Sequence, residues 1–269
     1  QLRRDLGDKR SIAVSLNHIG NLYLGRGDLK QAMVYFREAL SLRKETGDRQ
    51  GVADTYNNLA ALCMERGNHD QAVALFGEAL ELARDIGYRT TEAVLLNNLG
   101  EASLQNDALG DADDYLGQAR SVAEDSGDKR ILCDVYRNLG GLAQARGSTD
   151  DAIELVERAL ELADELESQS LIGTAKQSMA AIYAELSTTE DDNESAETAD
   201  ELFSEAIELL EDVGNESQLA RCLSGYGEFL IDRGDTVQGR QRLETAREMF
   251  DRLQIKKLWE ATTQNLSEL

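Results

Sequence analysis

Residues 16–39 read LNHIGNLYLGRGDLKQAMVYFREA, and this stretch contains two apolar patterns separated by a turn signal. The first pattern has apolar residues at helical spacing around a small residue, at Leu16, Ile19, Gly20 and Tyr23. The dipeptide Gly27-Asp28 marks a turn. The second pattern alternates small and bulky residues, at Ala32, Phe36 and Ala39. The stretch therefore predicts two antiparallel helices.

The same pattern recurs along the whole chain. The small residue of the first helix returns every 40 residues, at Gly20, Ala60, Gly100, Gly140 and Ala180. The small residue of the second helix follows the same period, at Ala32, Ala72, Ala112 and Ala152. The sixth first-helix equivalent, Gly227, comes 47 residues after Ala180, so the fifth unit carries seven extra residues. Repeated helix pairs predict an all-α solenoid, in which each unit packs on its neighbours.

The small residues and the helix ends fit this interpretation. Where two helices cross closely, a glycine or alanine in one admits a bulky side chain of the other. Glycines at the expected ends of second helices are again 40 residues apart, at Gly7, Gly47, Gly87 and Gly127. Aspartates that follow them are candidate N-caps of the next unit, at Asp8, Asp48 and Asp128.

Composition excludes several classes of function. The net charge of −23 disfavours nucleic-acid binding and binding to anionic membranes. The three cysteines have neither metal-ligand nor CxxC spacing, and they are expected to be small buried residues in a reducing, cytoplasmic environment. No apolar run approaches the length of a membrane span. We expect no cofactor, no metal, no nucleic-acid partner and no membrane partner.

The two-helix pattern resembles the tetratricopeptide repeat, with bulky-x-x-Leu-Gly-x-x-Tyr in the first helix and Ala-x-x-x-Phe-x-x-Ala in the second. Units of 40 residues without proline, instead of 34 with proline, imply longer helices than that family usually has. Such units are similar to those of Pins-type proteins, kinesin light chains and bacterial regulators. The resemblance implies a right-handed α-solenoid whose concave groove is lined by the first helices.

On this basis we expect a single array over residues 1–269. Its parts are the end of a preceding repeat at 1–7, six units at 8–47, 48–87, 88–127, 128–167, 168–214 and 215–253, and a C-terminal capping helix at 254–269. The fifth unit contains an acidic insertion near 187–196, which we expect to be a solvated loop that binds no calcium. Because the chain opens within a repeat, we expect it to be a piece of a longer protein.

Candidate ligand contacts follow from the position of each residue within the repeat. Polar residues that should face the groove lie three positions before the small residue of each first helix. They are Asn17, Asn57, Asn97, Arg137, Gln177 and Ser224. An amide offers a donor and an acceptor to the main chain of an extended peptide. Neighbouring residues would supply selectivity, namely Asn21 and Glu101 as polar contacts, and Leu24, Met64 and Leu104 as apolar contacts.

The next position along each first helix has a different expected role. His18, Asn58, Asn98 and Asn138 stand there, and the resemblance implies that an asparagine at this position forms a hydrogen bond between units. The only histidines, His18 and His69, have no nucleophile at matching spacing, so no enzymatic activity is expected.

Charge is concentrated in one part of the chain. Between Asp150 and Glu216 there are 21 acids against two bases, so this zone is a candidate for contact with a basic segment of a partner.

The sequence predicts a scaffold that binds a peptide or protein segment as the interaction or regulatory arm of a larger protein. An alternative is a peptide-sensing domain that switches an attached kinase, transcription factor or peptidase. A third is non-catalytic support within a peptidase or kinase. The oligomeric state is left open.

Overall fold

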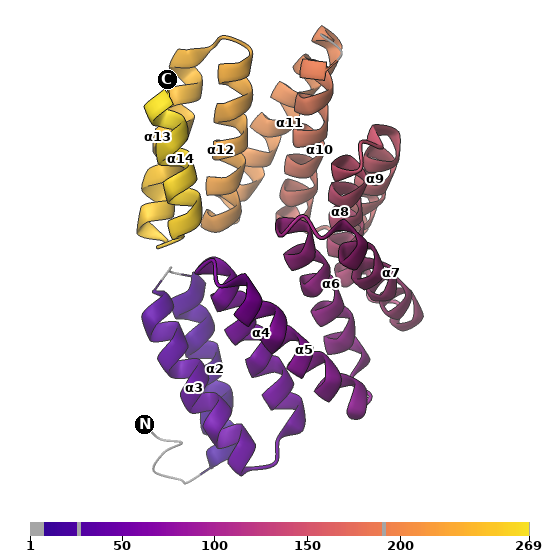
Figure 1. The fold of residues 1–269 in the computed structure, drawn as a ribbon, viewed down its shortest axis with the longest axis vertical. Coiled ribbons are helices and arrows are strands. Elements are labelled where there is room, and N and C mark those ends of the chain that lie inside the picture. Colours follow the sequence, from indigo (N-terminus) through magenta and orange to yellow (C-terminus); the bar gives the residue numbers. More distant parts are fainter. Residues whose placement is uncertain (1–7, 26–27, 190–191, 269) are drawn as a thin grey trace. The chain divides into compact units, whose positions relative to one another are not determined.

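The computed structural model describes residues 8–25, 28–189 and 192–268, and all their regular structure is helical. Two compact units are present, one with α2 to α7 and the other with α8 to α13 and most of α14 (Figure 1). The first comprises α2 (Lys9–Gly25), α3 (Leu29–Glu45), α4 (Arg49–Glu65), α5 (His69–Asp85), α6 (Arg89–Gln105) and α7 (Leu109–Ser126). The second comprises α8 (Lys129–Ala145), α9 (Thr149–Glu165), α10 (Gln169–Thr189), α11 (Asn193–Asp212), α12 (Glu216–Asp232), α13 (Thr236–Arg252) and α14 (Lys256–Glu268).

Consecutive helices pack as pairs in both units. In the first unit the pairs are α2 with α3, α4 with α5, and α6 with α7; in the second they are α8 with α9, α10 with α11, and α12 with α13. First helices of adjacent pairs also touch, so that α4 contacts α2 and α6, and α10 contacts α8 and α12. The predicted all-α arrangement of stacked helix pairs is confirmed.

Local signals at the helix ends act as predicted. The carboxylate of Asp48 accepts a hydrogen bond from the backbone N–H of Gly51 at 3.0 Å, and that of Asp128 accepts one from Ile131 at 3.2 Å. Gly47, Gly87 and Gly127 have φ of 67°, 69° and 66°, the left-handed conformation that a C-terminal cap requires. The short, regular turns therefore follow from the sequence.

The small residues of the first helices lie where helices cross, as predicted. A Cβ atom added to Gly20 would lie 2.5 Å from Cε1 of Phe36, and one added to Gly140 would lie 2.5 Å from Cγ2 of Val156. Phe36 and Val156 are fully buried. Each glycine thus makes room for the bulky residue of its partner helix.

The seven extra residues of the fifth unit extend helices instead of forming a loop. Helix α10 has 21 residues and α11 has 20, whereas α8 and α9 have 17 each, so the two helices grow by about one turn apiece. The predicted solvated loop near 187–196 is therefore wrong for the described residues, of which Ser187 and Ser195 are buried. The segment contains neither glycine nor proline, and Asp192 caps α11 through the N–H groups of Glu194 and Ser195. Residues 190 and 191 lie outside the described part.

Ion pairs connect the first residue of a hairpin's first helix to the last turn of its second helix. They recur with the repeat, as Lys9–Glu45 at 2.7 Å, Arg49–Asp85 at 3.1 Å, Arg89–Asp125 at 3.2 Å and Lys129–Glu165 at 2.8 Å. All these side chains are largely exposed, so each pair contributes at most about 1 kcal/mol.

Two expectations concerned the ends of the chain. The expected end of a preceding repeat at 1–7 lies outside the described residues. At the other end, the predicted helical face of the tail is present in α14, where Leu266 is buried and Leu258 and Trp259 are half-buried. Within the described part of the chain, none of the helices combines the length and the hydropathy of a membrane span.

Candidate functional site

One side chain from each first helix forms the line of candidate ligand contacts, called here the first-helix line. In the first unit it consists of Asn17 on α2, Asn57 on α4 and Asn97 on α6; in the second unit it consists of Arg137 on α8, Gln177 on α10 and Ser224 on α12. Asn17 and Asn97 are buried, and the other four are half-buried.

In the first unit, hydrogen bonds between hairpins use the line. Nδ2 of Asn58 donates to Oδ1 of Asn17 at 3.2 Å, and Nδ2 of Asn98 donates to Oδ1 of Asn57 at 2.8 Å. These are the inter-unit bonds that the sequence predicted for Asn58 and Asn98, and their acceptors are the candidate ligand contacts themselves. The Oδ1 atoms of Asn17 and Asn57 therefore already serve the packing of α2, α4 and α6.

The neighbouring candidate residues differ in exposure. Leu24, Met64 and Leu104 are half-buried apolar side chains, one at the end of each first helix of the first unit. Asn21 is exposed, and Glu101 is half-buried and accepts a hydrogen bond from Nε2 of Gln105 at 3.4 Å. Apolar and polar candidate contacts thus lie one turn apart on the same helices.

In the second unit, two members of the line carry buried atoms that lack a hydrogen-bond partner among the described residues. These atoms are Nε of Arg137 and Oε1 of Gln177. Ser224, the third member of the line in the second unit, forms a side-chain hydrogen bond with Glu228.

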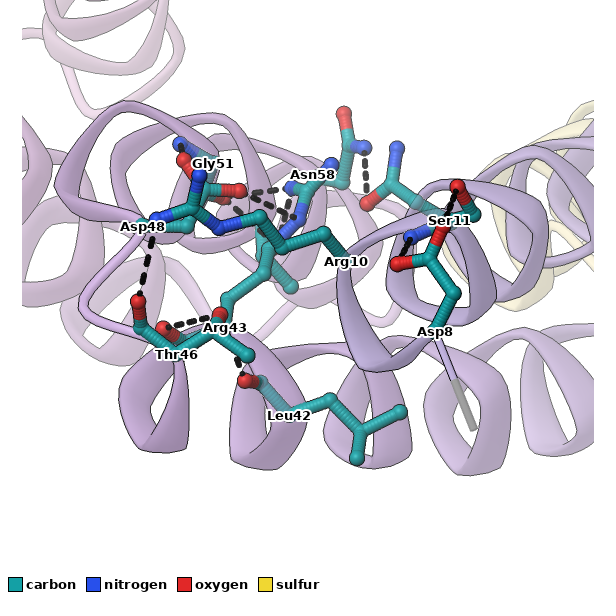
Figure 2. A network of polar contacts seen from close by, with 11 residues as sticks. Asp8, Arg10, Ser11, Leu42, Arg43, Thr46, Asp48, Gly51 and Asn58 are labelled. Carbon is teal, nitrogen blue, oxygen red and sulfur yellow. Dashed lines mark hydrogen bonds and ion pairs between the residues drawn. The ribbon is translucent and has the colours of Figure 1, made fainter. Parts of the chain in front are cut away.

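A buried arginine network at the junction of α3 and α4 was not predicted (Figure 2). Nη1 of Arg43 donates to the backbone oxygen of Gly51 at 2.5 Å and to Oγ1 of Thr55 at 2.6 Å. Its Nε lies 3.9 Å from Oδ2 of Asp48. The only signal in the sequence was the arginine itself, since the equivalent positions in the next three units hold alanine, at Ala83, Ala123 and Ala163.

Asp54 is the carboxylate most affected by this network. Burial raises the pKa of Asp54, and the positive charge of Arg43 opposes that increase in pKa. Oγ1 of Thr91 also donates to Asp54, at 3.3 Å. The network holds α3 and α4 together.

The cysteine side chains are buried, as predicted. Burial raises the pKa of Cys133 and of Cys222 to about 12, and it also raises the pKa of Cys63. These thiols stay protonated at neutral pH, so they are poor nucleophiles. Among the residues that the structure describes, no three His, Cys, Asp or Glu side chains cluster as metal ligands would.

The hydrogen bond between Asn58 and Asn17 leads to a prediction about stability. Asn58→Ala should lower the free energy of unfolding by about 1 kcal/mol, because Oδ1 of the buried Asn17 loses its donor. Urea unfolding followed by circular dichroism measures this change. Asn21→Ala, at an exposed position of the neighbouring helix α2, is the control and should have little effect. Equal losses in the two variants would contradict a packing role for Asn58.

Comparisons with known proteins agree with this architecture. Family models described as "Tetratricopeptide repeat" match residues 12–46, 51–125 and 91–165, which together make up more than half of the chain. No curated protein sequence matches the chain.

Solved structures with similar folds include aspartyl phosphate phosphatase F from Bacillus subtilis, with a TM-score of 0.72, 15% identity and coverage of 90% of this chain. The Rap conjugation gene regulator of plasmid pLS20, in complex with the Phr* peptide, has a TM-score of 0.70, 18% identity and coverage of 91%. Kinesin-light-chain-type TPR-like repeats from Podosopora anserina have a TM-score of 0.55 and 15% identity, with coverage of 77% of this chain and 98% of theirs. The chain spans 60% of the length of the phosphatase and 64% of the Rap regulator.

Proposed function

Because the chain belongs to the tetratricopeptide repeat family, we propose that it binds a peptide or protein segment along its first helices. Proteins of this family typically bind proteins or peptides and are generally non-catalytic. In this proposal the chain is the interaction or regulatory arm of a larger cytoplasmic protein, without enzymatic activity or cofactor of its own. The observation that carries the proposal is the first-helix line, which repeats amide or other polar side chains at one register position of every hairpin.

A second candidate function is peptide sensing that switches an attached effector. It is favoured by the similarity in fold to the Rap regulator whose structure contains the Phr* peptide. A passive scaffold and a sensor differ in one measurable property, since only a sensor changes shape when the ligand binds. Small-angle scattering with and without a bound peptide separates them, because a sensor should contract and a scaffold should keep its radius of gyration.

Surface charge in the second unit supports a basic partner. Carboxylates along α9 and α11 are exposed, among them Glu154, Glu157, Glu201 and Glu208. Such a surface attracts lysine- and arginine-rich segments, repels nucleic acid and anionic membranes, and raises association rates most at low salt.

Selection from a library of random 12-residue peptides, presented to the immobilised chain, tests the proposal. We expect enrichment of peptides rich in lysine and arginine, with association rates that fall about tenfold or more as salt rises from low to high concentration. A variant with glutamine at positions 154, 157, 201 and 208 is the matched control and should lose most of that salt dependence. Peptide binding would be refuted by a library that stays as diverse after selection as before.

A further inference from the structure

One side of α2 is exposed where the next five first helices are buried. Leu22 is 64% exposed, whereas its equivalents in those helices are at most 4% exposed: Leu62, Ala102, Leu142, Ile182 and Phe229. Ser15 and Ile19 are half-buried, and the equivalents of both are buried in all five helices. Ser15, Ile19 and Leu22 recur at helical spacing and form one strip along the helix, called here the α2 strip.

In later hairpins a second helix covers the equivalent strip. Leu62 of α4 lies in a core cluster with Phe36 of α3. Ile182 of α10 lies in a core cluster with Ala152 and Val156 of α9. Within the described residues, no helix precedes α2. The α2 strip therefore lacks the counterpart of α3 or α9, which is a helix with small and bulky residues at the spacing of the second helices.

The composition of the α2 strip differs from that of a solvent-facing terminal helix. Terminal helices of a solenoid usually expose polar residues, and α14, the last described helix, does so. Its exposed residues are Lys256, Lys257, Glu260, Ala261, Gln264, Ser267 and Glu268. In α2 the exposed Leu22 has the half-buried Ile19 and Tyr23 beside it, so the apolar surface extends over neighbouring residues. Such a surface indicates an interface.

Helix α10 shows which kind of helix fits this side of α2. The α2 positions 12, 15, 19, 22 and 23 hold Ile, Ser, Ile, Leu and Tyr, and the equivalent α10 positions 172, 175, 179, 182 and 183 hold Ile, Ala, Met, Ile and Tyr. Helix α9 packs on these positions of α10, with Leu162 and Ile172 in one cluster and Val156 and Ile182 in another. Because a short turn joins α9 to α10, the two helices run antiparallel.

We propose that the α2 strip is a docking surface for one amphipathic helix of a partner protein, which runs antiparallel to α2 and resembles α9. Small and β-branched residues of the docked helix pack on Ile19 and Leu22, as those of α9 pack on α10. Lys9 and Arg10 are exposed at the start of α2, where they attract carboxylates in the last turn of the docked helix.

The partner differs from a second copy and from the peptide of the proposed function. In the described residues of a second copy, each second helix packs on the first helix of its own hairpin, and residues such as Ala72 and Phe76 are buried there. A second copy thus has no such helix to offer. Helical periodicity places Asn17 and Asn21 on a different side of α2 from the strip, so the helix and the peptide use different surfaces.

A peptide with the sequence of α9, Thr149–Glu165, is the probe for this surface. A hydrocarbon staple between positions 157 and 161, which are exposed in α9, keeps it helical, because an isolated helix of 17 residues is marginal in water. Fluorescence anisotropy of the labelled peptide measures its affinity for the whole chain. Leu22→Glu should weaken binding at least about tenfold, because the docked helix would bury a carboxylate.

Val34→Glu is the matched control and should bind the peptide as the parent does. Val34 is also an exposed apolar residue of the first hairpin, and its equivalents are exposed in all five later hairpins. Both variants should keep the melting temperature of the parent, because both positions face solvent. Within the peptide, Val156→Glu should weaken binding as Leu22→Glu does, and Glu154→Gln should not.

Two results of the binding measurement would overturn the inference. One is the absence of binding to the parent chain. The other is equal affinity for the parent and for Leu22→Glu, which would show that the peptide exchanges with α9 on α10 or binds elsewhere. Sedimentation equilibrium tests the remaining occupant. A dimer of the parent that Leu22→Glu dissociates would show that a second copy covers the strip, and would also overturn the inference.

Competition separates this inference from the proposed function. A basic peptide selected from the 12-residue library should not displace the α9 peptide, and displacement would refute a separate surface. If the library yields no peptide while the α9 peptide binds in a Leu22-dependent way, the proposed function fails and the docking surface stands.

Discussion

Gly100→Leu is expected to lower the free energy of unfolding by about 3 kcal/mol, at the upper end of what overpacking usually costs. A Cβ atom at position 100 would lie 2.5 Å from both Cγ and Cδ2 of Leu116. Leu116 is fully buried and cannot move aside without displacing its neighbours. A leucine adds three further carbon atoms at this crossing of α6 and α7. Urea unfolding followed by circular dichroism measures the change.

Gly117→Leu is the matched control. Gly117 is next to Leu116 on α7, and no atom lies within 4 Å of a Cβ added there. Leucine is a much better helix former than glycine, so this variant should be as stable as the parent or more stable by up to about 1 kcal/mol. Similar losses in the two variants would show that the glycine at the crossing is not required for packing.

Arg43→Met is expected to lower the free energy of unfolding by about 2 to 3 kcal/mol at pH 7. Methionine keeps much of the apolar stem but loses the bonds to Gly51 and Thr55 and the charge that faces Asp54. Arg37→Met, at an exposed position of the same helix, is the control and should change stability by less than about 0.5 kcal/mol.

The loss in Arg43→Met should depend on pH. Burial already raises the pKa of Asp54 in the folded chain, and removal of Arg43 raises that pKa further. A folded pKa above the unfolded value means that the ionised carboxylate destabilises the fold at pH above the folded pKa. This destabilisation disappears as the pH falls below the unfolded pKa of about 3.9. The variant should therefore lose less stability at pH 4 than at pH 7, and Asp54→Asn should recover part of the loss at pH 7. A loss that is the same at both pH values would contradict this role of Asp54.

Much of the fold could be predicted because its signals are local or periodic. The caps at Asp48 and Asp128 act on residues three positions later, and the left-handed glycines stand at the ends of helices. The pairing of Gly20 with Phe36 follows from two helices that repeat the same small and bulky spacing. Each of these features requires only neighbouring residues or a constant period.

The acidic insertion shows where such signals are ambiguous. A run of acidic and small polar residues suits a solvated loop, but it also forms helix when a cap stands within it and no glycine or proline interrupts it. Asp192 is such a cap, and packing buries Ser195 of the added turn. The packing decided between two conformations that the local sequence permits.

The first-helix line shows a different limit of prediction from the sequence. Its register position was predictable, whereas the role of each side chain depended on its partner in another hairpin. Oδ1 of Asn57 accepts a bond from Asn98, whereas Oε1 of Gln177 has no partner among the described residues, although both line residues are amides at the same register position.

The amino-acid sequence by itself determined the repeat, the helix pairs and the residues that pack at their crossings, because these depend on spacing along one chain. Only the tertiary structure decided which polar atoms of the first-helix line are paired. A hydrogen bond between residues 41 positions apart exists only within a few tenths of an ångström of its ideal length, and packing of whole helices sets that distance.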